Sequence, residues 1–115
     1  MAPRTTADEC LPSGEWLALA FRFLGKRWNA VVLGRLSLGR AGFRELSRAI
    51  DGISDSVLAN RLADLTAGGL ITRTVEDGPP LAVYYELTER GAALVPALEQ
   101  IADWARDNLQ DDEPR

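Results

Sequence analysis

The sequence contains no histidine and only one cysteine, Cys10. A catalytic triad that uses histidine is therefore impossible, and a tetrahedral zinc site of the usual Cys/His kind is nearly so. Cys10 cannot form a disulfide within the chain and can pair only with another chain or a small thiol. Glycine-rich phosphate loops, metal-ligand clusters and paired carboxylates in an apolar setting are also missing. We therefore expect no enzyme, no catalytic residue, no metal site and no cofactor.

Long hydrophobic runs are missing as well. No run reaches the roughly 18 apolar residues that a membrane span requires, and residues 1–10 have no apolar core of a signal peptide. These absences predict a cytoplasmic protein with no membrane segment. The length of 115 residues and the apolar fraction of 46% are ordinary for one compact domain.

The net charge of −4 argues mildly against binding to nucleic acid, but the charges are unevenly distributed. Residues 22–48 contain one acid, Glu45, and seven basic residues: Arg22, Lys26, Arg27, Arg35, Arg40, Arg44 and Arg48. Acidic residues predominate after position 76. DNA responds to the local field, which salt screens over about 8–10 Å, more than to the total charge. The first half of the chain therefore remains a candidate for nucleic-acid binding.

The centre of the chain predicts a helix-turn-helix followed by a β-hairpin. A helix over residues 43–50 ends at the turn Asp51-Gly52, and a second helix starts after Ser54 and ends at Gly68-Gly69. Residues 71–75 and 83–87 have strand character, and the Gly-Pro-Pro segment between them is typical of a turn. This order predicts an α+β, mostly α fold: a winged helix-turn-helix with a two-stranded β-hairpin wing. Such a module places one helix in the major groove of DNA and the hairpin beside it.

Two apolar helices flank this module. Residues 1–13 are expected to form a flexible arm, and a helix is expected over about 14–25, in which every residue from Trp16 to Leu24 except Arg22 is apolar. A last helix over about 88–109 starts at the N-cap Thr88, and an acidic tail covers 110–115. Both helices are more apolar than the core of one small domain can cover, so we expect dimerisation helices within a 14–109 domain. The expected interface residues are Trp16, Leu17, Leu24, Leu94, Leu98, Ile101 and Trp104.

Several short motifs resemble the HxlR-type winged helix-turn-helix regulators of the MarR-like group. They are Gly25-Lys26-Arg27-Trp28, Phe43-x-Glu45-Leu46-x-Arg48, Gly52-Ile53-Ser54, Val57-Leu58-x-x-Arg61-Leu62-x-x-Leu65, Gly69-Leu70-Ile71-x-Arg73 and Tyr85-x-Leu87-Thr88-x-x-Gly91. The match spans about residues 16–105. It implies a homodimeric bacterial regulator whose first and last helices form the dimer and whose helix after Ser54 enters the major groove.

The chain departs from the family pattern at three places. Asp55-Ser56 replaces a Pro-Lys pair, and Leu81-Ala82 stands where the wing commonly carries a basic residue. Both changes reduce the expected phosphate binding at these positions. Glu15 occupies the place where redox-sensing members have their cysteine, with Cys10 five residues upstream, so a sensing role does not carry over to Cys10.

Six residues are predicted to contact DNA: Ser54, Ser56, Asn60, Arg61, Arg48 and Arg73. Arg61 fits a bidentate contact with guanine, although an ion pair with Asp64 or another acid is the alternative. Asn60 and Ser56 suit adenine or phosphate unless they are merely solvated. Ser54 is expected to cap its helix first, and Arg48 and Arg73 to position the DNA backbone.

The function predicted from the sequence is sequence-specific transcriptional regulation by a homodimer bound to a pseudo-palindromic operator in double-stranded DNA. One alternative is a winged helix that docks a partner protein, which the net charge and the weakly basic wing favour slightly. Another is a regulator that senses a small molecule in an aromatic pocket near Trp16, Trp28 and Trp104. Ordinary packing of these tryptophans is the simpler explanation.

Overall fold

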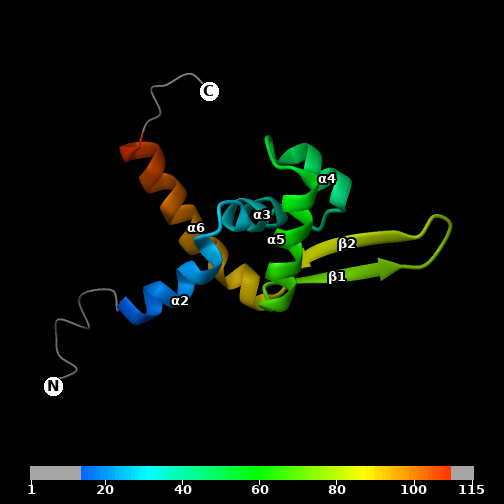
Figure 1. The fold of residues 1–115 in the computed structure, drawn as a ribbon, viewed down its shortest axis with the longest axis horizontal. Helices are drawn as coiled ribbons and strands as arrows, with labels where there is room; N and C mark the ends of the chain where they lie inside the picture. Colours follow the sequence, from blue (N-terminus) through cyan, green and yellow to red (C-terminus); the bar gives the residue numbers. More distant parts are fainter. Residues whose placement is uncertain (1–13, 110–115) are drawn as a thin grey trace.

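The computed structural model describes residues 14–109, which form five helices and a two-stranded antiparallel sheet (Figure 1). The elements are α2 (Gly14–Leu24), α3 (Asn29–Leu36), α4 (Phe43–Ala49), α5 (Asp55–Ala67), β1 (Ile71–Glu76), β2 (Ala82–Leu87) and α6 (Glu89–Asn108). This is the mostly helical fold with a hairpin wing that the sequence predicts. The expected arm 1–13, the acidic tail 110–115 and Cys10 lie outside the described residues.

Local hydrogen bonds explain where three of the helices begin. The backbone N–H of Gly42 donates to Glu45 Oε1 at 2.9 Å at the start of α4. Ser54 Oγ accepts from the Val57 N–H at 3.2 Å at the start of α5. Thr88 Oγ1 accepts from the Gly91 N–H at 3.1 Å at the start of α6. Each bond satisfies an N–H that has no partner inside its helix, and the predicted caps Ser54 and Thr88 are confirmed.

The hydrophobic core lies between α3, α4, α5 and the start of β1. Its fully buried side chains include Leu33 on α3, Leu46 on α4 and Leu58 on α5, and Ile71 on β1 is 1% exposed. Truncating one such leucine to alanine typically costs about 2–5 kcal/mol of stability. The helix-turn-helix is therefore built around the core itself, which holds α4 and α5 rigidly with respect to each other.

The wing is a hairpin whose register runs from Ile71 opposite Leu87 to Glu76 opposite Ala82. Ala41 and Tyr85 exchange two backbone hydrogen bonds of 3.0 and 2.8 Å, which attach the segment before α4 to β2. A two-stranded hairpin alone is marginally stable in water. The added bridge helps to explain how the wing holds its shape while it projects away from the helices (Figure 1).

Arg40 makes a second link between the segment before α4 and the wing. Its Nη1 donates to Glu76 Oε2 at 2.8 Å, and its guanidinium carbon lies 4.0 Å from the centroid of the Tyr84 ring. The hydrogen bond to Glu76 raises the pKa of the Arg40 guanidinium above its ordinary value. Arg40 therefore contacts both strands, a role that its place in the basic stretch of the sequence does not predict.

The last helix is fixed to the wing root by a close contact at Gly91. A Cβ atom at this position would overlap the carbonyl oxygen of Leu70, so a larger residue would push α6 away from the core. Thr88 Oγ1 also donates to the Gly69 carbonyl at 2.7 Å. These contacts set the direction in which α6 leaves the helix-turn-helix module.

The terminal helices expose a large apolar surface, as the sequence predicts. No residue of α2 is buried, and Trp16 is 68% exposed. On α6, Ile101 and Trp104 are 50% and 55% exposed. In Figure 1, α2 lies on the side of the molecule away from the wing, and α6 starts at the base of the wing and runs away from it. Within residues 14–109, no helix is both long and apolar enough to cross a membrane.

The predicted dimer-interface residues divide into two groups. Leu24, Leu94 and Leu98 are partly buried and pack against the core of their own chain. The others are exposed on α2 and α6: Trp16, Leu17, Ile101 and Trp104. Only the second group is free to meet a partner without leaving a packed position.

Candidate nucleic-acid interface

Helices α4 and α5 and the turn between them form the helix-turn-helix. Ile50 and Ile53 are buried and anchor the turn, whereas Gly52 has a φ of 89°, a left-handed conformation that favours glycine. Ser47 Oγ donates to Asp55 Oδ1 at 3.1 Å, which joins the end of α4 to the start of α5. The turn therefore has both a buried anchor and a polar link.

One face of α5 is exposed along about two turns. Ser56, Ala59, Asn60 and Ala63 are spaced at i, i+3, i+4 and i+7, and all four are exposed. We call these four residues the reading face. The predicted outward positions of Ser56 and Asn60 agree with this arrangement, whereas Ala59 and Ala63 were not among the predicted site residues.

Arg61, which is predicted to contact DNA, is only partly exposed in the fold. The Arg61 side chain is 19% exposed, and its Nη2 lies 3.0 Å from Asp64 Oδ2. Arg61 Nε is buried and has no hydrogen-bond partner among residues 14–109. Because Arg61 follows Leu58 by three positions and precedes Leu65 by four, it lies at the edge of the buried stripe of α5. The alternative prediction, an ion pair with Asp64, describes its environment.

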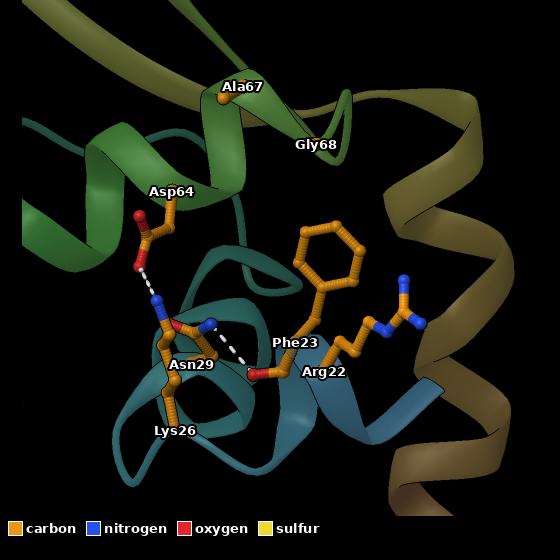
Figure 2. Close-up of a pocket in the computed structure, with 7 residues that line it drawn as sticks. All are labelled: Arg22, Phe23, Lys26, Asn29, Asp64, Ala67 and Gly68. Atoms are coloured by element: carbon orange, nitrogen blue, oxygen red, sulfur yellow. Dashed lines mark hydrogen bonds and ion pairs between the residues drawn. The ribbon is translucent and has the colours of Figure 1, made fainter. Parts of the chain in front are cut away.

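Asp64 also binds Lys26, which follows α2. Lys26 Nζ lies 2.9 Å from the same oxygen, Asp64 Oδ2, as shown in Figure 2. The hydrogen bond from Lys26 and, to a smaller extent, the charge of Arg61 hold the pKa of the Asp64 carboxyl below its ordinary value of 3.8. This link could not be predicted from the sequence pattern because its two partners are 38 residues apart.

Two further contacts join the end of α2 to α3 and α5 around a cleft of about 280 Å³ (Figure 2). Asn29 is fully buried, and its Nδ2 donates to the Phe23 carbonyl at 2.8 Å. The ring of Phe23 lies so close to Gly68 that a Cβ atom there would overlap it. The end of α2, the start of α3 and the end of α5 therefore form one packed cluster, which connects the expected dimer helix to α5.

The two predicted backbone-positioning arginines lie on the helix before α5 and on the strand after it. Arg48 is exposed in the last turn of α4, and Arg73 is exposed on β1. Neither forms an ion pair with another residue of the described part of the chain. Arg73 borders a groove of about 410 Å³ between α5 and the wing, lined by Phe43, Ala59, Leu62, Ala63, Thr66, Ala67, Arg73 and Tyr85.

Trp28 has an ordinary structural explanation. It packs against the core, and the guanidinium carbon of Arg27 lies 4.7 Å from the centroid of its ring. Trp16 and Trp104 are instead exposed on α2 and α6. Among residues 14–109, no group of three or more His, Cys, Asp or Glu side chains is arranged to hold a metal ion.

The sequence model of the HxlR-like helix-turn-helix family matches residues 23–113, which include α3, the helix-turn-helix, the wing and α6. The chain belongs to this family. The chain is also similar to proteins named as helix-turn-helix transcriptional regulators. The transcriptional regulator YodB of Bacillus subtilis is 38% identical over 86 residues, which cover 75% of this chain and 77% of YodB. A regulator of Methanothermobacter thermautotrophicus is 35% identical over 99 residues, covering 86% and 73% of the two chains.

Solved structures show the same fold. The reduced form of YodB from B. subtilis superposes with a TM-score of 0.76 at 33% identity, covering 88% of this chain and all of YodB. The redox regulator HypR in its reduced form gives a TM-score of 0.77 at 28% identity, covering 82% of this chain and 93% of HypR. This HxlR-like chain is thus a helix-turn-helix transcriptional regulator with a winged-helix DNA-binding fold, in which α5 is the recognition helix.

Proposed function

We propose that this HxlR-like protein acts as a homodimer that binds a pseudo-palindromic operator in double-stranded DNA. The observation that carries the proposal is the division of the molecule into two sides. The wing projects on one side, next to α5, and helices α2 and α6, which carry exposed apolar side chains, extend on the other (Figure 1). The side with α5 and the wing would bind DNA, and the side with α2 and α6 would bind a second copy of the chain.

The dimer surface combines two features. Trp16 and Leu17 on α2 are exposed, as are Ile101 and Trp104 on α6. A groove of about 380 Å³ runs between α3 and α6 and is lined by Ala30, Val31, Gly34, Ser37, Val95, Leu98, Glu99, Ile101, Ala102 and Ala105. Soluble monomers rarely expose apolar patches larger than a few hundred Å². A second subunit would cover these side chains.

Dimerisation would also set the distance between the two recognition helices, and therefore the spacing of the half-sites that the protein can bind. Two recognition helices related by a two-fold axis read half-sites about 34–36 Å apart, one turn of DNA, or a multiple of this distance. Gly91 and the cluster around Asn29 fix α6 and α2 against the helix-turn-helix. The dimer contacts would therefore determine the spacing of the two α5 helices, and a change at α2 or α6 would alter DNA affinity.

We further propose distinct roles for the predicted DNA-binding residues. Ser56 and Asn60 approach base edges, and Ser54 caps α5 close to a phosphate. Arg48 and Arg73 contact the DNA backbone, since both are exposed beside α5. Arg61 pairs with Asp64 on its own helix instead of reaching into the groove, and Asp64 in turn joins α5 to Lys26.

A mobility-shift assay with DNA from upstream of the protein's own gene and neighbouring genes tests the proposed function. The proposal predicts a shifted complex that contains one dimer and survives competition by a scrambled duplex. If no upstream fragment is shifted at low salt, the regulator proposal fails. The same protein binding a protein partner instead would support the alternative of a protein-docking winged helix.

A further inference from the structure

The recognition helix lacks a free cation. Arg61 is the only lysine or arginine between residues 55 and 67. Its side chain is 19% exposed and is paired with Asp64, on the edge of the helix that faces Lys26 rather than on the reading face. An arginine or lysine bound to guanine O6 and N7 is the most common specific contact in the major groove. The reading face cannot make this contact.

The reading face instead presents two methyl groups, an amide and a hydroxyl. Ala59 and Ala63 each expose a methyl group, Asn60 exposes its amide, and Ser56 exposes its hydroxyl. Alanine packs against the C5-methyl group of thymine, and asparagine forms two hydrogen bonds with N6 and N7 of adenine. Asp55 is the remaining exposed charge at the start of α5, and its Oδ1 already accepts a hydrogen bond from Ser47.

We infer that α5 reads A·T base pairs in each half-site, with Ala59 and Ala63 against thymine methyl groups and Asn60 on adenine. The inference rests on the proposed function and adds the class of base pair that it recognises. The position of the DNA-binding site is inferred from the helix-turn-helix, and the class of base pair is inferred from the chemistry of the four exposed side chains. Arg48 and Arg73 add affinity through contacts with the DNA phosphate backbone, and these contacts do not select a sequence.

Modified bases test this inference one contact at a time. The full-length protein first selects its preferred sites from a random duplex library. Each thymine of the selected half-site is then replaced by deoxyuridine, which removes only the C5-methyl group, and each adenine by 7-deaza-adenine, which removes only N7. We expect at least one thymine per half-site at which deoxyuridine weakens binding about fourfold, the factor that corresponds to burial of one methyl group.

Variants of the protein assign each effect to a side chain. Ala63→Ser or Ala59→Ser should abolish the deoxyuridine effect at one thymine, and Asn60→Ala should abolish the 7-deaza effect at one adenine. Ala93→Ser, at an exposed position on α6, is the matched control and should retain both effects.

The outcomes separate this inference from the proposed function. Selected half-sites with guanine at the contacted positions, or binding that is insensitive to both base analogues, would overturn A·T reading while leaving a DNA-binding regulator. Failure to bind or enrich any duplex at low salt would instead overturn the proposed function.

Discussion

Asp64 Oδ2 lies 3.0 Å from Arg61 Nη2 on the preceding turn of α5 and accepts a second cation, Lys26, at 2.9 Å. Arg61 has the sequence features of an arginine that reads bases, but this arrangement gives it a structural role. It also connects the end of α2 to the recognition helix. Both consequences can be tested by mutation.

Arg61→Ala should reduce stability and leave base preference unchanged. Loss of the guanidinium leaves Asp64 with one cationic partner and exposes part of the buried stripe, so we expect a loss of about 1 kcal/mol. Chemical denaturation measures the loss, and titration with operator and scrambled duplexes measures the preference. Arg61→Lys is the control that retains the charge. A variant of unchanged stability that loses discrimination against one base would show that Arg61 reads DNA.

Asp64→Asn should destabilise the protein at neutral pH and have less effect in acid. The pKa of Asp64 is lowered in the folded protein by Lys26, relative to an ordinary value of 3.8. The carboxylate therefore stabilises the fold above about pH 4, and this contribution is lost as the pH falls through the lowered folded pKa. The difference in unfolding free energy between parent and variant should shrink below pH 4. A difference that is constant down to pH 2 would contradict the assignment, and Asp103→Asn on exposed α6 serves as the control.

Arg48→Ala and Arg73→Ala should each weaken binding to operator and scrambled DNA alike. Both side chains are exposed beside α5, where they are proposed to neutralise phosphates. Removing one phosphate contact per subunit should make the slope of log K against log salt shallower by about 2 for a dimer. Arg106→Ala on α6, whose partners are acids of its own helix, should leave the slope unchanged. If a variant lost affinity for the operator but kept its affinity for scrambled DNA, the substituted arginine, Arg48 or Arg73, would be assigned to base reading.

Ile101→Glu combined with Trp104→Glu should convert the dimer into a folded monomer with weak operator affinity. These side chains are half-exposed on α6 and do not contribute to the buried core of their own chain. Glutamates there would bury unpaired charge in the proposed interface, which costs several kcal/mol. Sedimentation measures the mass. Leu38→Glu, at an 81% exposed position after α3, should remain dimeric. A dimeric double variant with full DNA binding would show that the subunits meet elsewhere.

The fold could be predicted from sequence because its signals are local. Ser54 and Thr88 cap helices through bonds to residues three positions away, and the glycines and prolines near residues 68 and 79 end the regular elements. The apolar faces of α2 and α6 are likewise visible in the sequence. Such periodic and capping patterns require no knowledge of distant contacts.

The interface was predicted less completely because it depends on long-range contacts. Arg61 is predicted to contact DNA, whereas in the fold it lies at the edge of the buried stripe and pairs with Asp64, whose second partner, Lys26, is distant in the sequence. Ala59 and Ala63 carry no polar group that would mark them in a sequence, and only their exposure in α5 makes them candidates. The packing of Leu98 against its own core was also invisible from its place in the apolar stripe of α6.

The measurement that tests the central claim most directly is the salt dependence of operator binding by the purified protein. Fluorescence anisotropy monitors the binding, and the mass of the complex is determined in parallel. A dimer that contacts about 6–10 phosphates should lose about 10³–10⁵ in affinity between 50 and 200 mM salt. The account predicts this loss together with two chains per operator. An affinity that does not change with salt, or a complex with one chain per operator, would contradict it.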